Sequence, residues 1–343
     1  MSNPLPSAPL HEAAGVSKVM LRVVYALLPG IAAYMWFFGW GVVVNIVFAI
    51  LVALAAEALM LALRKRPIKP FLLDGSALVT AVLLALSLPP LAPWWLTLIG
   101  TAFAIIVAKQ LYGGLGFNPF NPAMIGYVVL LISFPREMTL WLAPAALSGH
   151  YLGLADAALF IFTGRLPQGL SVDAVSAATA LDSLKTQLGM GHGVTEALRA
   201  GPIFGALGGY GVEWINGLFL IGGLWLIRRR VISWHIPTAM LAAMAALALI
   251  FYVINPDRYA PPLFHLFTGA TMLGAFFIAT DPVTASTTPR GRLLYGAGIG
   301  VLTYVIRTWG GYPDAVAFAV LLMNMAAPMI DHYTQPRVFG HKD

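Results

Sequence analysis

Long runs of apolar residues alternate with short polar or basic breaks along most of this chain. A helix that crosses ~30 Å of hydrocarbon needs ~20 mainly apolar residues, with a wide range around that length. The pattern therefore predicts an all-α integral membrane protein with about ten transmembrane helices. The expected spans are roughly 20–38, 42–63, 76–88, 94–109, 122–135, 206–227, 236–254, 262–280, 293–307 and 314–331.

The breaks between these runs contain turn and anchor residues. Gly39-Trp40-Gly41 predicts a tight turn between the first two spans. Arg64-Lys65-Arg66 follows the second span and Arg228-Arg229-Arg230 follows the sixth, as basic residues do at the cytoplasmic ends of membrane helices. The third run stops at Pro89-Pro90, which makes it short for a full crossing.

The apolar runs fall into two groups, which we interpret as two five-helix halves. The segment between the groups is mixed in character, and an interfacial helix is expected at 137–147. The predicted organisation has five parts. They are a cytoplasmic tail at 1–19, a first repeat at 20–149, an outer loop at 150–205, a second repeat at 206–333 and a cytoplasmic tail at 334–343.

Composition supports the membrane assignment and excludes several functions. The chain is 59% hydrophobic and 10% charged, whereas soluble proteins carry about 25% charged residues. We attribute the net charge of +6 to cytoplasmic loops, not to a nucleic-acid surface. The absence of cysteine excludes disulfides, thiolate-bound iron–sulfur clusters and a cysteine nucleophile. The seven histidines lack metal-ligand spacing, so no metal site is expected.

The distribution of Lys and Arg predicts the orientation. An even number of crossings places both termini on one side, and that side receives fourteen of the twenty basic residues. The positive-inside rule then places both termini in the cytoplasm of a bacterial inner membrane. The 150–205 loop would lie at the periplasmic face.

A weak internal repeat relates the two halves. The residues from Gly75 align with those from Gly269, and those from Pro122 align with those from Pro313. Apolar helices also resemble each other by chance. Five crossings in each half would make the repeat inverted, and corresponding short helices point to a binding site near the midplane.

One polar stretch stands out in the outer loop: Asp173-x-x-Ser176-x-Ala178-Thr179. On composition alone it is a loop leading into a short amphipathic helix, with Asp182 and Lys185 exposed to water. The order of residues, however, resembles the flavinylation motif of the NqrB/RnfD family, with Ala177 in place of the usual glycine. Further segments resemble this family, and the chain length favours its RnfD branch. They are Lys109–Gly116, Asn118–Tyr127, Thr280–Thr288 and Gly310–Asp314.

The resemblance implies a fold, a cofactor and a complex. The fold would be like that of urea and ammonium transporters. Thr179 would carry covalent FMN as a phosphoester made by a flavin transferase, and Asp173, Ser176 and Ala178 would serve recognition or phosphate binding. Alternatively, the motif residues only cap a turn. By analogy with NqrB, the resemblance also allows a second flavin, riboflavin.

The family works in a membrane complex, so the resemblance also implies partners. These are the RnfA, RnfB, RnfC, RnfE and RnfG subunits of an ion-translocating ferredoxin:NAD oxidoreductase. This chain would relay electrons while the complex moves Na+ or H+; ferredoxin and NAD would bind to other subunits. A solute channel of the urea type, without a redox role, would suit the same fold. A third interpretation is a scaffold subunit whose flavin is vestigial.

Acidic residues provide candidates for an ion path. Glu57 lies within the second predicted span, while Glu213 and Asp314 lie near outer helix ends. An ionised carboxylate in hydrocarbon costs at least ~2.5 kcal/mol, so such residues usually face the protein interior. Alternatively, Glu57 extends toward the basic cluster Arg64-Lys65-Arg66.

A second polar island at Thr280–Thr288 contains Asp281, Thr284 and Ser286. Its carboxylate and hydroxyl groups are candidates for an ion path or a second flavin site. Equally, the island is a helix end followed by a loop, with Asp281 as an N-cap. Asn118-Pro119-Phe120-Asn121-Pro122 is interpreted as a structural loop that leads into the fifth span.

Overall fold

The computed structural model describes residues 9–167, 169–312 and 314–335. In this part of the chain the structure is helical, with two isolated β-bridges and no β-strand, which confirms the predicted all-α class. The outer parts of the predicted tails, at 1–8 and 336–343, lie outside the described residues, as does Pro313 of the repeat alignment.

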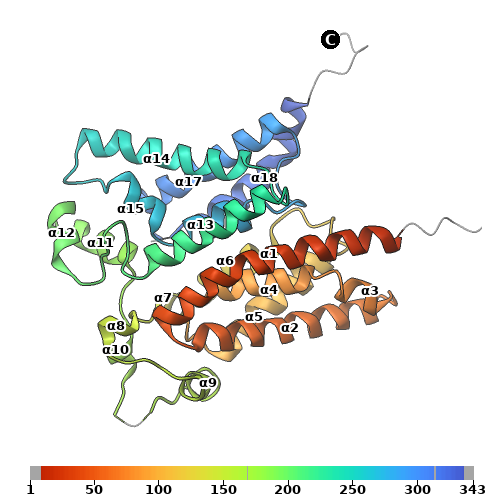
Figure 1. Ribbon diagram of the computed structural model, residues 1–343, viewed down its shortest axis with the longest axis horizontal. Helices are drawn as coiled ribbons and strands as arrows, with labels where there is room; N and C mark the ends of the chain where they lie inside the picture. The colour runs from red at the N-terminus through yellow and green to blue at the C-terminus, as the bar shows by residue number, and fades with distance from the viewer. Residues whose placement is uncertain (1–8, 168, 313, 336–343) are drawn as a thin grey trace, which may run out of the picture.

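The two predicted halves form two neighbouring helical bundles (Figure 1). The helices of the first bundle are α1 (Pro9–Phe38), α2 (Gly41–Leu63), α3 (Ile68–Leu72), α4 (Ser76–Ser87), α5 (Trp94–Ala102) continued by the π-helical η1 (Phe103–Gln110), and α6 (Pro122–Ser133). Those of the second are α13 (Val212–Arg228), α14 (His235–Ile254), α15 (Pro262–Phe267), α16 (Thr271–Leu273) continued by the π-helical η2 (Gly274–Ile278), α17 (Pro289–Trp309) and α18 (Val316–Thr334).

Between the bundles in sequence lies an outer segment of short helices. They are α7 (Pro135–Thr139), α8 (Ala145–Ser148), α9 (Leu154–Thr163), α10 (Val172–Val175), α11 (Ala180–Gly189) and α12 (Val194–Ala200). In Figure 1 this segment lies at one end of the long axis, and α3 lies toward the other end. Thr179 and the basic residues after α2 are therefore at opposite ends of the molecule.

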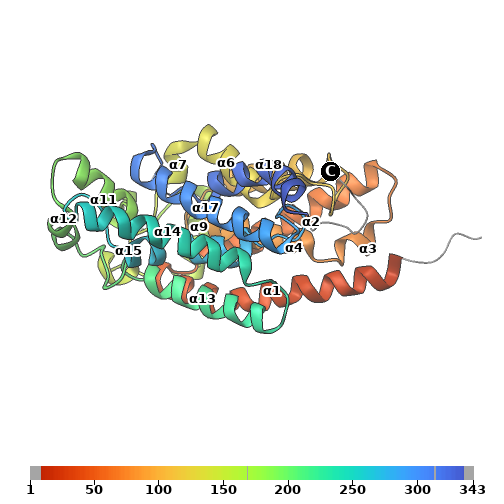
Figure 2. The same ribbon diagram turned by 90° about the horizontal axis from the view of Figure 1, so that it is seen from above.

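Helices α1 and α13 join the two bundles, and they lie side by side in both views (Figures 1 and 2). Their close approach depends on glycine at position 222. A Cβ atom there would lie 2.1 Å from the backbone oxygen of Ala26, far inside van der Waals contact. A second contact between the bundles comes from the Asn118–Pro122 loop, where the Asn121 backbone N–H donates to Asn324 Oδ1 on α18 at 3.0 Å.

The tight turn and the short third helix are both as the sequence predicts. Gly39 adopts φ +80° between α1 and α2, and α4 has 12 residues. The predicted run 262–280 is not one helix, because the chain leaves the helical conformation at Thr268 and Gly269. Gly269 has φ +59° and Gly75, its partner in the repeat alignment, has φ +79°. Glycine tolerates these conformations because it lacks a Cβ atom.

Among the residues that the structure describes, four helices are long and apolar enough to cross a membrane by length and composition. They are residues 15–38 of α1, and α2, α14 and α18. The remaining predicted spans are helices of 17 residues or fewer, or, in α17, carry several arginines. The structure thus has the helices of a membrane protein, while the count of ten crossings stays a prediction.

Three local predictions differ from the structure. The first helix begins at Pro9, not near residue 20, because Pro is favoured at a helix start and Glu-Ala-Ala promotes helix after it. The interfacial helix at 137–147 is wrong: the chain is extended around Leu142 and forms a bridge to Ser176. Helix α9 was not predicted, although it is apolar and ends at Gly164 with φ +72°.

Candidate functional site

Thr179 is the N-cap of α11. Its backbone is extended, with φ −66° and ψ 161°, and its Oγ1 accepts a hydrogen bond from the Asp182 backbone N–H at 3.2 Å. Threonine is a favoured N-cap residue because its hydroxyl satisfies one of the free N–H groups of the first turn. The hydroxyl oxygen is the acceptor in this hydrogen bond, so the hydroxyl hydrogen is not used by it. The half-buried Thr179 is therefore held in place while its hydroxyl can still react.

The other motif residues precede α11 on the surface. Asp173 is exposed in the first turn of α10, whose N-cap is Ser171. Ser176 ends α10 and forms the bridge with Leu142, and Ala178 is exposed. Asp173 and Ala178 are thus accessible to another protein, and the capping function belongs to Ser171 and Thr179.

A cavity opens beside Thr179, between the two bundles. Its volume is about 150 Å³. Its lining is largely apolar and aromatic, with a few polar groups. The lining includes Tyr34, Tyr127, Trp141, Phe219 and Asp314. Such a cavity suits a planar aromatic ligand with polar edges.

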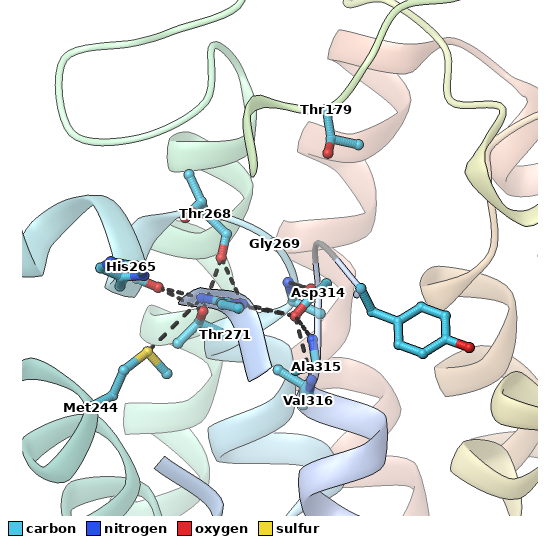
Figure 3. Close-up of polar contacts among 12 residues, drawn as sticks. Thr179, Met244, His265, Thr268, Gly269, Thr271, Asp314, Ala315 and Val316 are labelled. Carbon is cyan, nitrogen blue, oxygen red and sulfur yellow. Dashed lines mark hydrogen bonds and ion pairs between the residues drawn. The ribbon is translucent and has the colours of Figure 1, made fainter. Parts of the chain in front are cut away.

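An ion pair between a buried arginine and an aspartate that is 25% exposed lies at the cavity wall opposite Thr179 (Figure 3). Arg307 Nη2 donates to Asp314 Oδ1 at 2.9 Å, and the arginine side chain is 1% exposed. The same guanidinium donates to the backbone oxygens of His265 and Thr268, at 2.8 and 3.4 Å. In Figure 3 the Thr179 side chain points toward the segment that carries Gly269 and Asp314.

The outer segment is attached to the second bundle through Lys185 on α11. Its ammonium group donates to the backbone oxygens of Gly310 and Tyr312, in the loop between α17 and α18. Burial lowers the pKa of the Lys185 ammonium, and the neighbouring Asp182 carboxylate opposes that shift. Lys185 is thus not the freely solvated residue that an amphipathic helix predicts.

Glu57 is buried, at 1% exposure, and is paired with a residue far away in sequence. Its Oε1 accepts from Lys109 Nζ at 2.6 Å and from Gln110 Nε2 at 2.8 Å. The alternative in which Glu57 extends toward the 64–66 cluster is therefore wrong. Arg64 and Arg66 donate to the backbone oxygens of residues 111 and 113 instead.

The Thr280–Thr288 island is a compact set of capping interactions. Asp281 accepts from the Val283 backbone N–H at 3.2 Å and from Thr284 Oγ1 at 3.0 Å. Ser286 donates to Asp331 Oδ1 on α18. The N-cap of α17 is Thr288, not Asp281. In the residues that the structure describes, no cluster of His, Asp and Glu could hold a metal ion.

Sequence reasoning missed the partners of the buried charges. Lys109 and Arg307 were counted among the charges on the two sides of the membrane, yet both side chains are buried. Both are the last residue included in a predicted span, and this was the available signal, because charged residues within spans usually face a protein interior. When Lys109 and Arg307 are left out of the count, the side that holds the termini still carries more Lys and Arg than the other side.

Comparison with known proteins identifies the family. The NQR2, RnfD, RnfE family matches residues 5–340. The chain belongs to this family. The D subunit of the ion-translocating oxidoreductase complex of Escherichia fergusonii is 54% identical over 340 residues, which cover 97% of this chain and 96% of that protein.

The corresponding proteins of two other bacteria are equally similar. The one from Aeromonas hydrophila is 55% identical over 347 residues, covering 97% of both chains. The one from Yersinia enterocolitica is 56% identical over 340 residues, covering 97% of this chain and 96% of that protein. The resemblance that the motifs suggested is confirmed over nearly the whole chain.

Proposed function

We propose that this chain is the membrane-embedded RnfD-type subunit of an ion-translocating oxidoreductase complex. It relays electrons through FMN bound covalently to Thr179, and the complex couples this transfer to the movement of H+ or Na+. The observation that carries the proposal is the position of the Thr179 hydroxyl, which caps α11 at the edge of an aromatic-lined cavity.

The residues around Thr179 suit a flavin phosphate. The N-terminus of α11 presents backbone N–H groups and a positive dipole end, which favour a phosphate group. The apolar and aromatic cavity wall, with the tyrosines Tyr34 and Tyr127, suits an isoalloxazine ring. When bound, the flavin supplies the electron-transfer chemistry. The chain has no cysteine that could ligate an iron–sulfur cluster for this purpose.

The departure from the family motif at Ala177 does not weaken this proposal. Glycine is required where the backbone adopts positive φ, and Ala177 is not among the residues with positive φ. Its backbone N–H donates to the Trp141 oxygen at 3.0 Å, so alanine fits the bridge without strain. Asp173 and Ala178 are exposed and available to a flavin transferase.

We also propose the finer architecture that accompanies this function. Ten crossings form two inverted repeats, both termini are cytoplasmic, and the Thr179 segment is periplasmic. The shared left-handed conformation at Gly75 and Gly269, each before a short helix, supports the repeat. The location of the 64–66 cluster and Thr179 at opposite ends supports the orientation.

The partners and the second cofactor follow from the family. The partners would be RnfA, RnfB, RnfC, RnfE and RnfG, with an exported flavin transferase for maturation. Riboflavin remains a candidate second flavin. A solute channel of the urea type is not favoured, because the relatives that cover the whole chain are named as subunits of an oxidoreductase complex.

A denaturing gel viewed under ultraviolet light tests the proposal. The chain is produced together with an active flavin transferase, and the wild type should give a fluorescent band. Thr179→Ala should remove the band, whereas Thr186→Ala, an exposed threonine of the same helix, should keep it. A colourless wild-type chain, or a fluorescent Thr179→Ala band, would contradict covalent attachment at this residue.

A further inference from the structure

A buried hydrogen-bonded network extends from the basic end of the first bundle into its interior. Lys109 Nζ donates to Glu57 Oε1 and to Ser76 Oγ, both at 2.6 Å. Ser76 Oγ in turn donates to Asp74 Oδ1 at 2.5 Å. All four side chains are buried, and Asp74, at 7%, is the most exposed of them. We call these four residues the Glu57 network.

Three helical elements bring these residues together. Glu57 comes from α2, six residues before its end at Leu63, which places it about 9 Å along the helix from that end. Lys109 comes from η1, and Ser76 is the first residue of α4. Asp74 lies two residues before α4, close to the exposed segment with helix α3 that follows the 64–66 cluster.

The network has an unpaired acceptor and an uncompensated charge. Glu57 Oε2 is buried and has no hydrogen-bond partner among the described residues. Two carboxylates and one ammonium give a formal charge of −1 in the protein interior. Buried charges are normally paired, and a buried acceptor without a partner is costly. A static ion pair would not need the second carboxylate or leave the Glu57 oxygen free.

A proton fits this site better than a metal cation does. Cations held by oxygen ligands need several of them at once, whereas the site offers one free carboxylate oxygen. The Lys109 ammonium, 2.6 Å from the other oxygen of Glu57, would repel a second cation. Adding one proton to the Glu57 carboxylate neutralises the network and turns Glu57 into a hydrogen-bond donor.

The other charged side chains near the network do not compensate its charge or pair with Glu57 Oε2. Arg64 and Arg66 are engaged with backbone oxygens. On α1, Met20 faces Gly75, while the nearby Lys18 is exposed. Arg22 on α1 and Lys69 on α3 are also exposed, and α4 and α5 carry no other ionisable side chain.

We propose that the Glu57 network takes up protons for the ion-translocating complex, with Asp74 as the outer group and Glu57 as the inner acceptor. This inference rests on the proposed function and specifies the proton as the ion that this chain handles. The side of uptake is the cytoplasm in the proposed orientation.

The transfer moves one proton from Asp74 to Glu57. A proton that arrives on Asp74 passes to Ser76 Oγ, and the serine hydroxyl proton passes to Lys109 Nζ as the lysine gives its own proton to Glu57. Asp74 is then ionised again and Glu57 is neutral, while Ser76 and Lys109 return to their original states. Glutamine at position 57 has no carboxylate and cannot accept this proton.

The test uses the whole complex in inverted membrane vesicles supplied with its electron donor. Proton movement is followed with a pH-sensitive dye, and covalent flavin and its reduction by the donor are measured in the same vesicles. Glu57→Gln should lower the initial rate of proton movement about 100-fold, the scale on which a positioned acid–base group acts. Flavin content and flavin reduction should be unchanged. Glu196→Gln, at an exposed carboxylate of α12, should behave as the wild type.

A double variant without either charge, called the neutral pair, controls for a folding defect. In Glu57→Gln combined with Lys109→Met, no buried ammonium is left without its partner. This double variant should also fail to move protons while it keeps the flavin. The inference is overturned if either variant moves protons as fast as Glu196→Gln does. It is also overturned if the loss in Glu57→Gln is restored in the neutral pair.

The wild type separates this inference from the proposed function. Covalent flavin together with transport of radioactive sodium and no proton movement would reject the proton relay alone. Absence of covalent flavin from the wild type would reject the proposed function instead.

Discussion

Replacing Asp314 by alanine should destabilise the second bundle at the wall of the cavity. The carboxylate accepts from Arg307 Nη2 at 2.9 Å and Nε at 3.3 Å. It also accepts from the backbone N–H groups of Ala270 and Ala315, both at 2.8 Å. The truncation therefore leaves a buried guanidinium and two backbone donors without this acceptor.

The expected loss can be estimated from these contacts. Breaking a buried ion pair by removing one partner costs about 3–5 kcal/mol, because the remaining charge is left uncompensated. The Asp314 side chain is 25% exposed, and Arg307 would keep its bonds to the oxygens of His265 and Thr268, so we expect the lower end, about 3 kcal/mol. Asp314→Asn keeps an acceptor oxygen and loses the charge, so it should cost about 1–2 kcal/mol.

The measurement is unfolding of the purified chain by sodium dodecyl sulfate in mixed micelles, followed by circular dichroism. Asp173→Ala removes a carboxylate that is exposed and should change the free energy of unfolding by less than about 0.5 kcal/mol. A loss below about 1 kcal/mol for Asp314→Ala would refute the reasoning, because it would give the pair the strength of a surface salt bridge.

Two further substitutions test other parts of the fold by the same unfolding assay. Gly222→Ala should cost about 1–3 kcal/mol, because its Cβ atom would overlap the Ala26 oxygen. Gly217→Ala, where no atom lies within 4 Å, should be neutral or stabilising by up to ~1 kcal/mol. Equal losses of stability for both variants would contradict the close packing at Gly222. Thr179→Ala should cost about 1 kcal/mol through the lost N-cap, even in chains that were never flavinylated. An unfolding free energy equal to that of Thr186→Ala would show that the cap is unimportant.

Local signals predicted the helices well where their ends have local causes. The turn at Gly39 and the shortness of α4 before Pro89 depend on residues within a few positions of the helix ends. The same reasoning failed at 137–147, because the chain there pairs with Ser176, more than thirty residues further on. No local propensity reports a contact at that separation.

The candidate site was predicted in part. The motif ending at Thr179 drew attention to a residue that lines the cavity, and Thr179 could be recognised as an N-cap from the helical pattern that follows it. The cavity beside it could not be predicted, since its lining comes from helices throughout both bundles. Nor could the pairing of Arg307 with Asp314, because a loop must first fold back over the helix end.

The sequence by itself determined that this is a helical membrane protein of the NQR2, RnfD, RnfE family, since apolar run length, turn residues and motifs are properties of neighbouring positions. The tertiary structure alone decided which buried charges meet. Glu57 and Lys109 are 52 residues apart, and their contact depends on how α2 and η1 are rotated about their own axes. That rotation is set by packing of whole helices against each other, a property that no single segment carries.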